Sequence, residues 1–231
     1  MTAPTFTLHE SAKNPHADIW FADPPGFTAL PLEALLAPPG SPPAVELQAA
    51  FAPFLAAAPD ELSRQQFIGQ VASGQQLLAA LREVGTVYCS IGLHRDDTEG
   101  GDGRTLLSLF TLGWQDTATA PRAITAARAV ATADNRHTHI EFLELPCGPA
   151  TLSETLRSPA ADSGLPQQPL LQIHAHLPAP NGKRLAVLTL STTAVAHREA
   201  YRGILRQIAE LVSFDDPLGA VEEGDPSVPL R

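Results

Sequence analysis

The chain has 231 residues, 44% of them hydrophobic, and carries a formal net charge of −10. A chain of this length and apolar content can bury a core without disulfides or a structural metal, which excludes global disorder. Its Lys and Arg residues occur in runs of no more than two. This acidic balance argues against non-specific binding to nucleic acid or to an anionic membrane, since both depend on basic patches.

The two cysteines, Cys89 and Cys147, lie in apolar, strand-like segments and have no metal-ligand spacing. Buried reduced thiols are the expected state, and a disulfide between the two is the alternative. Residues 1–15 lack the basic and apolar regions of a signal peptide, and no apolar stretch reaches ~18 residues. We therefore expect a cytoplasmic protein that does not span a membrane.

The first half of the chain predicts two short strands, a loop and two helices. The strands are expected over residues 18–21 and 27–30. The proline-rich segment 37–43 predicts a loop. Helical spacing of apolar residues predicts one helix over 47–55 and a second one from Asp60 to about residue 84.

The second half predicts six strands and two helices, without regular strand–helix–strand alternation. The strands are expected over residues 87–93, 106–114, 139–145, 151–157, 170–177 and 184–193, and the helices over 121–133 and 195–212. This order favours an α+β fold with an antiparallel β-sheet backed by helices. We expect a flexible N-terminal segment at 1–16, a single domain over 17–214 and an acidic flexible tail at 215–231.

Three segments give the chain a resemblance to a known group of proteins. They are the Pro24-Pro25-Gly26-Phe27 turn, the Asn181-Gly182-Lys183-Arg184 hairpin and the end of the last helix, Ile208 to Phe214. In these the chain resembles the Mog1/PsbP-like superfamily, which includes the LpqN and DcrB-type bacterial proteins. The resemblance implies a sheet backed by helices and a role as adaptor, chaperone or assembly protein. The superfamily has no shared catalytic centre, so no site residue is implied. The chain is also similar to uncharacterised actinobacterial proteins.

Two His-x-His pairs are the sharpest chemical pattern. His137 and His139 precede Glu141 in one predicted strand, and His174 and His176 lie in another. Because side chains alternate along a strand, both histidines of a pair are expected to point to the same face. On neighbouring strands, the four imidazoles and the carboxylate would form a ligand set for Zn²⁺ or another divalent transition metal. The alternatives are a protein-binding or pH-responsive face and an ordinary polar surface.

The same alternation predicts which apolar side chains are buried. Ile140 and Phe142 are expected to face the core in the first strand, and Ile173 and Ala175 in the second. A shared metal site needs the two strands side by side, since zinc–nitrogen bonds are about 2 Å long.

Motifs that carry catalysis or nucleotide binding are missing from the sequence. There is no G-x-S-x-G elbow, phosphate-binding loop or dinucleotide fingerprint, and the acidic loop 96–103 lacks the final glutamate of an EF-hand. The leading hypothesis is therefore a non-catalytic adaptor, chaperone or assembly protein that binds a protein partner and needs no cofactor. The alternative is a metal-binding protein or metal-dependent enzyme that uses the histidine pairs.

Overall fold

The computed structural model describes residues 18–22, 26–30, 34, 37, 40–57, 61, 64–65, 85–96, 105–131, 137–158 and 169–215. The segment 1–16, most of the helix predicted over 60–84 and nearly all of the tail 215–231 lie outside the described residues.

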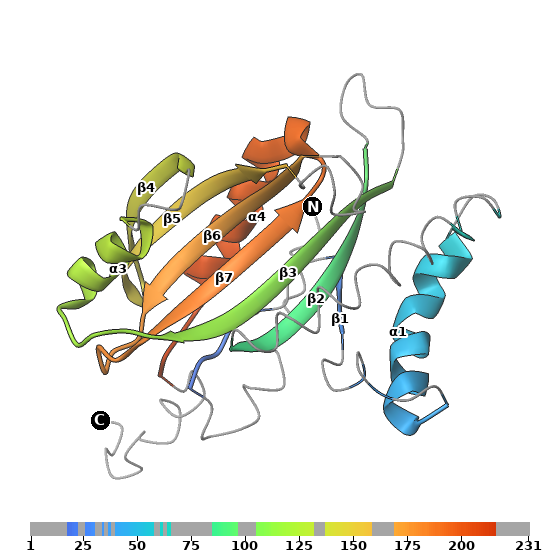
Figure 1. Cartoon of the computed structure of the whole chain (residues 1–231), viewed down its shortest axis with the longest axis horizontal. Coiled ribbons are helices and arrows are strands. Elements are labelled where there is room, and N and C mark those ends of the chain that lie inside the picture. The colour runs from blue at the N-terminus through green and yellow to red at the C-terminus, as the bar shows by residue number, and fades with distance from the viewer. Residues whose placement is uncertain are drawn as a thin grey trace, which may run out of the picture.

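Seven antiparallel strands form one sheet in the order β1-β2-β3-β7-β6-β5-β4 (Figure 1). The strands are β1 (Phe27–Ala29), β2 (Thr86–Arg95), β3 (Thr105–Asp116), β4 (His137–Leu145), β5 (Gly148–Arg157), β6 (Leu170–Pro178) and β7 (Arg184–Thr192). Every pairing along the sheet is antiparallel. The predicted α+β class with an antiparallel sheet is confirmed. The strand predicted over 18–21 is reduced to an isolated bridge between Trp20 and Ser213.

The chain crosses the sheet once, between β3 and β4. Helix α3 (Arg122–Val130) lies on this crossover and packs mainly on β5 and β6. From the outer strand β4 the chain then returns strand by strand until β7 pairs with β3. The last of these hairpins turns at Asn181-Gly182, where Gly182 has a φ of 65°, a conformation that glycine adopts at little cost.

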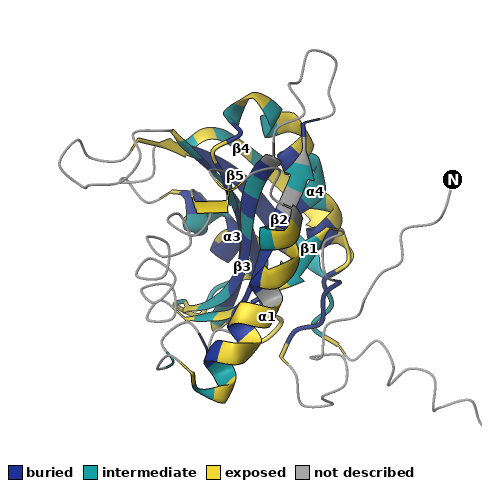
Figure 2. Cartoon of the chain, turned by 90° about the vertical axis from the view of Figure 1, so that its right-hand side faces the viewer, coloured by how far each residue is buried: buried dark blue, intermediate teal, exposed yellow. Residues whose placement is uncertain are grey.

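Helix α4 (Arg198–Glu210) covers one face of the sheet, which we call the α4 face. A single 3₁₀ turn, Val195–His197, leads into it. Tyr201, Leu205 and Ile208 are buried and join Phe110 of β3 and other inward residues in the main hydrophobic cluster. Buried residues follow the central strands, while helix α1 is largely exposed (Figure 2). The predicted C-terminal amphipathic helix is thus confirmed.

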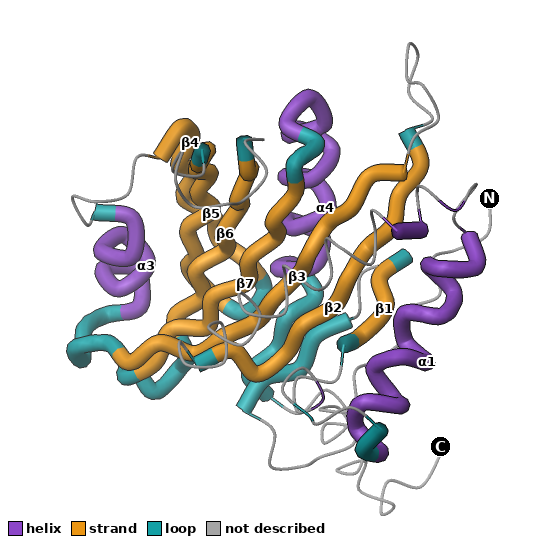
Figure 3. Tube along the Cα trace, turned by 45° about the vertical axis from the view of Figure 1, so that its right-hand side comes forward, coloured by secondary structure: helices purple, strands orange, loops and turns teal. Residues whose placement is uncertain are grey.

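The opposite face, the α3 face, carries two helices at its two ends. Helix α1 (Pro42–Ala57) lies beside β1 and α3 beside β4 and β5 (Figure 3). Leu47 and Phe51 of α1 contact Cys89 of β2 in a second, smaller cluster. The helix begins at Pro42, inside the predicted loop 37–43. Proline is tolerated there because the backbone N–H groups of the first helical turn have no partner within the helix, so the N–H that proline lacks is not missed.

Candidate functional site

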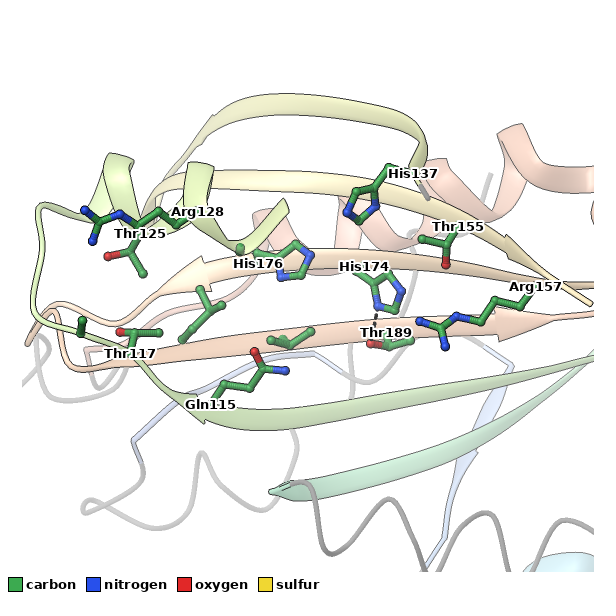
Figure 4. Close-up of a pocket in the computed structure, with 14 residues that line it drawn as sticks. Gln115, Thr117, Thr125, Arg128, His137, Thr155, Arg157, His174, His176 and Thr189 are labelled. Carbon is green, nitrogen blue, oxygen red and sulfur yellow. Dashed lines mark hydrogen bonds between the residues drawn. The ribbon is translucent and has the colours of Figure 1, made fainter. Parts of the chain in front are cut away.

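A pocket of about 500 Å³ lies on the α3 face, between α3 and the strands β3 to β7 (Figure 4). Its walls come from six elements that lie far apart in the sequence. They contribute Gln115, Thr117, Ala118, Thr125, Arg128, Ala129, His137, Thr155, Arg157, His174, His176, Leu185, Val187 and Thr189.

The second histidine pair forms the floor of the pocket. His174 and His176 alternate on β6 with Ile173 and Ala175, which are buried on the α4 face as predicted. His174 Nδ1 forms a hydrogen bond with Thr189 Oγ1 (2.9 Å). His176 Nε2 forms one with Ser153 Oγ (3.2 Å). The two ring centroids are 5.9 Å apart. These bonds to β5 and β7 fix both imidazoles in the pocket floor.

The first histidine pair is divided by a β-bulge. The register of β4 against β5 shifts between His137, which pairs with Thr155, and His139, which pairs with Glu154. A bulge adds one residue to a strand, so the alternation of side chains changes phase there. His137 consequently lies in the pocket with His174 and His176. The prediction that His137 and His139 share a face is wrong.

His139 and Glu141 lie on the α4 face. The Glu141 carboxylate is hydrogen-bonded and paired with Arg206 of α4, and its Oε2 lies 3.9 Å from His139 Nε2. The hydrogen bond and the positive charge of Arg206 hold the Glu141 pKa below its usual range. Within the described residues, no three His, Cys, Asp or Glu side chains are grouped to hold one metal ion. The five proposed ligands therefore form no single preorganised set.

The two floor histidines are held in the neutral form. Burial lowers the pKa of His174 to about 3, assisted by electrostatic repulsion of its protonated form by the basic side chains of His176, Arg157 and His137. Burial also lowers the pKa of His176 to about 4, with His137 adding to the effect. Near neutral pH each imidazole thus has one N–H donor and one acceptor nitrogen.

Six buried polar atoms of the pocket wall have no hydrogen-bond partner in the structure as described. They belong to five residues and are Thr117 Oγ1, Thr125 Oγ1, Thr155 Oγ1, His176 Nδ1 and both ring nitrogens of His137. Thr125, Thr155 and His176 are more than nine-tenths buried. Because buried polar groups in folded proteins are nearly always paired, a cluster of this size indicates a place for a polar ligand or for water.

Sequence reasoning missed the arginines of this pocket. Arg128 comes from α3 and Arg157 from the end of β5, and both are exposed at its rim. Neither has a carboxylate within ion-pair distance among the described residues. No local pattern marks either residue, because their proximity depends on the crossover that lays α3 over β5 and β6.

The position of α3 over the pocket depends on Arg122. Its Nε donates to the carbonyl oxygen of Pro178 (2.9 Å), and its Nη2 donates to that of Cys147. The guanidinium also lies 5.8 Å from the centre of the Phe214 ring. At Gly148 an added Cβ would lie 2.6 Å from Arg122 Nη1, which explains the glycine beside it. Arg122 thus joins the start of α3 to the β4–β5 turn and to the end of β6.

Replacing Arg122 with methionine is expected to loosen α3 selectively. The variant keeps an apolar stem but loses both hydrogen bonds, each worth about 1 kcal/mol. Amide hydrogen exchange in α3 should accelerate about tenfold, while amides in β3 and β7 serve as the internal control. An equal acceleration in all these elements would contradict a local role for Arg122.

Cys89 and Cys147 are not bonded to each other; Cys89 is buried as predicted, whereas Cys147 is only half-buried, in the turn between β4 and β5. Burial raises the pKa of the Cys89 thiol to about 12, so it is not a nucleophile near neutral pH.

In the acidic loop that begins at Asp96, Asp96 Oδ2 lies 3.3 Å from His197 Nε2. The rest of this loop, residues 97–104, lies outside the described residues.

In comparisons with known proteins, no family model, no curated protein and no solved structure matches this chain. None of the helices in the described ranges has both the length and the apolar character needed to cross a membrane.

Proposed function

We propose that this protein is a non-catalytic binding protein that holds a small ligand in the pocket between α3 and the sheet. The observation that carries the proposal is the cluster of six buried, unpartnered polar atoms in its wall. A volume of about 500 Å³ is within the range of small-molecule sites, which are largely preformed and carry a few convergent polar groups.

The geometry favours binding over catalysis. The hydrogen bond between Ser153 Oγ and His176 Nε2 resembles a nucleophile paired with its base. In a catalytic triad a carboxylate orients the other imidazole nitrogen, whereas His176 Nδ1 has no partner in the described structure. No carboxylate is among the described lining residues. We therefore interpret the Ser153–His176 pair as structural.

Other expectations drawn from the sequence stay predictions. They are the adaptor role with a protein partner, the Mog1/PsbP-like fold and the cytoplasmic location. Zn²⁺ or another divalent transition metal stays the alternative ligand predicted from the sequence, although within the described residues no three His, Cys, Asp or Glu side chains are grouped to hold one ion. Of the five predicted metal ligands, His139 and Glu141 lie on the other face.

A thermal-unfolding panel tests the proposal. The compounds are sulfate, phosphate, succinate, glucose, putrescine and Zn²⁺, each added to the wild type and to two variants of α3. Ala129→Trp fills the pocket, since Ala129 lines it, whereas Ala123→Trp adds the same bulk at an exposed position outside the pocket. At least one compound is expected to raise the Tm of the wild type and of Ala123→Trp, but not of Ala129→Trp.

Two outcomes would overturn the proposal. One is an unchanged Tm with every compound, and the other is an equal shift in both tryptophan variants. A response to Zn²⁺ alone that Ala129→Trp abolishes would select the metal-binding alternative.

A further inference from the structure

We infer that the ligand of this pocket is a small anion with carboxylate, phosphate or sulfate oxygens, and that His174 or His176 takes up a proton when the anion binds. The inference rests on the proposed binding function and names the chemical class of the ligand. Three features of the described pocket support it: the sign of its charges, the type of its donors and the surroundings of its imidazoles.

The charge of the pocket is opposite to that of the whole chain. Its described lining includes two arginines and three histidines but no Asp or Glu, in a protein with a formal net charge of −10. Local clusters of one charge in a concave, partly desolvated site concentrate ligands of the opposite charge. Such a lining attracts an anion and repels a metal cation.

The donors are arranged in two layers. Arg128 and Arg157 at the rim have guanidinium groups without an ionic partner among the described residues, and guanidinium forks bind carboxylate and phosphate oxygens in pairs. Below them the hydroxyls of Thr125 and Thr155 are buried without a partner and can donate to an oxyanion. Arg128 and Thr125 lie at one end of the pocket, and Arg157 and Thr155 at the other, so each end offers one guanidinium and one buried hydroxyl to an anion (Figure 4).

The imidazoles couple this binding to protonation. The titratable groups that face them are His137 from β4, Arg157 from β5 and Arg128 from α3, and all are basic. The described lining residues from β3 and β7 are uncharged. In the free pocket burial, assisted by Arg157 and His137, keeps His174 neutral, and burial, assisted by His137, keeps His176 neutral. A bound anion supplies the opposite charge, so it stabilises an imidazolium that donates from both nitrogens.

Titration calorimetry with sulfate tests this inference, because sulfate itself takes up no proton between about pH 5.5 and pH 8. Sulfate binding is expected to tighten as the pH falls. Runs in buffers of different ionisation enthalpy should show net proton uptake by the protein.

Three variants test which residues are responsible. His174→Gln/His176→Gln is expected to abolish the proton uptake, and Arg157→Gln is expected to weaken sulfate binding about tenfold. Lys183→Gln removes an equal charge outside the pocket and should match the wild type.

The outcomes separate this inference from the proposed function. Succinate and phosphate, titrated in the same way, distinguish a carboxylate ligand from a phosphorylated one. If glucose or putrescine binds in the pocket and no anion does, the anion inference fails while the binding function stands. If no compound binds, both fail. Sulfate binding that is independent of pH, or equally weakened by Lys183→Gln and Arg157→Gln, also overturns the inference.

Discussion

Replacing Glu154 with glutamine is expected to lower the free energy of unfolding by about 3 kcal/mol. Glu154 lies on β5, is 1% exposed and faces α4. Its Oε2 accepts a hydrogen bond from Arg202 Nη2 (2.6 Å), and its Oε1 accepts one from Thr138 Oγ1 (2.8 Å). Arg198 Nη1 lies 3.5 Å from Oε1. Burial alone would raise the Glu154 pKa, but these partners hold it below its usual range.

The cost arises because glutamine removes the buried countercharge of the largely buried Arg202 guanidinium, which keeps only the exposed carboxylate of Glu199. Urea unfolding measures the change, and Glu199→Gln is the matched control. Glu199 pairs with the same arginine but is 77% exposed, so its loss should change stability by no more than about 0.5 kcal/mol. Equal effects of the two substitutions would contradict the prediction. Glu154→Met combined with Arg202→Met should recover most of the stability, since no buried charge is then left unpaired.

Acidification from pH 7 to pH 5 is expected to destabilise the protein by up to about 2 kcal/mol for each of His174 and His176. In the unfolded chain both imidazoles take up a proton near the usual histidine value of 6.5. In the folded protein their pKa values are lowered to about 3 and about 4, by burial first and then by nearby positive charges. Between these values the unfolded state binds more protons, so stability rises with pH and falls as the pH is lowered.

The pH range of this effect, from pH 7 to pH 5, lies above the range in which carboxylates take up protons. Glu141 and Glu154 also have lowered pKa values, and their stabilising contribution is lost below about pH 4.5. Unfolding free energies measured by urea titration from pH 5 to pH 7 should depend less steeply on pH in His174→Gln/His176→Gln, and His94, whose pKa burial also lowers, accounts for part of the remaining slope. A double variant with an unchanged slope would show that other groups cause the acid sensitivity.

Most of the sheet could be predicted from the sequence, because strands and tight turns are encoded by residues that are close together in the chain. The alternation in Leu170–Pro178, together with the Asn181-Gly182 turn, correctly predicted the β6–β7 hairpin and the shared face of His174 and His176. The predicted orientation of β4 was wrong. Ile140 and Phe142 were expected to face the core. They are 43% and 65% exposed, on an outer strand that tolerates apolar side chains in solvent.

The remaining features of the site depend on contacts between distant segments. A bulge at Thr138 leaves no mark in the apolar pattern, because it changes the pairing of β4 with β5 and not the sequence periodicity of either strand. Arg128 reaches the pocket through the β3–β4 crossover, and no short motif encodes that path. The ligand class follows from charges that only the fold assembles.

The bulge in β4 also has a consequence for how the sequence can vary. Consecutive residues at the start of β4 serve separate purposes: His137 lines the pocket, while the Thr138 hydroxyl donates to Glu154 on the α4 face. The same division recurs in β5, where Glu154 and Thr155 are neighbours. Substitutions at His137 and Thr155 are therefore expected to change the pocket, whereas substitutions at their neighbours Thr138 and Glu154 are expected to change the stability of the fold.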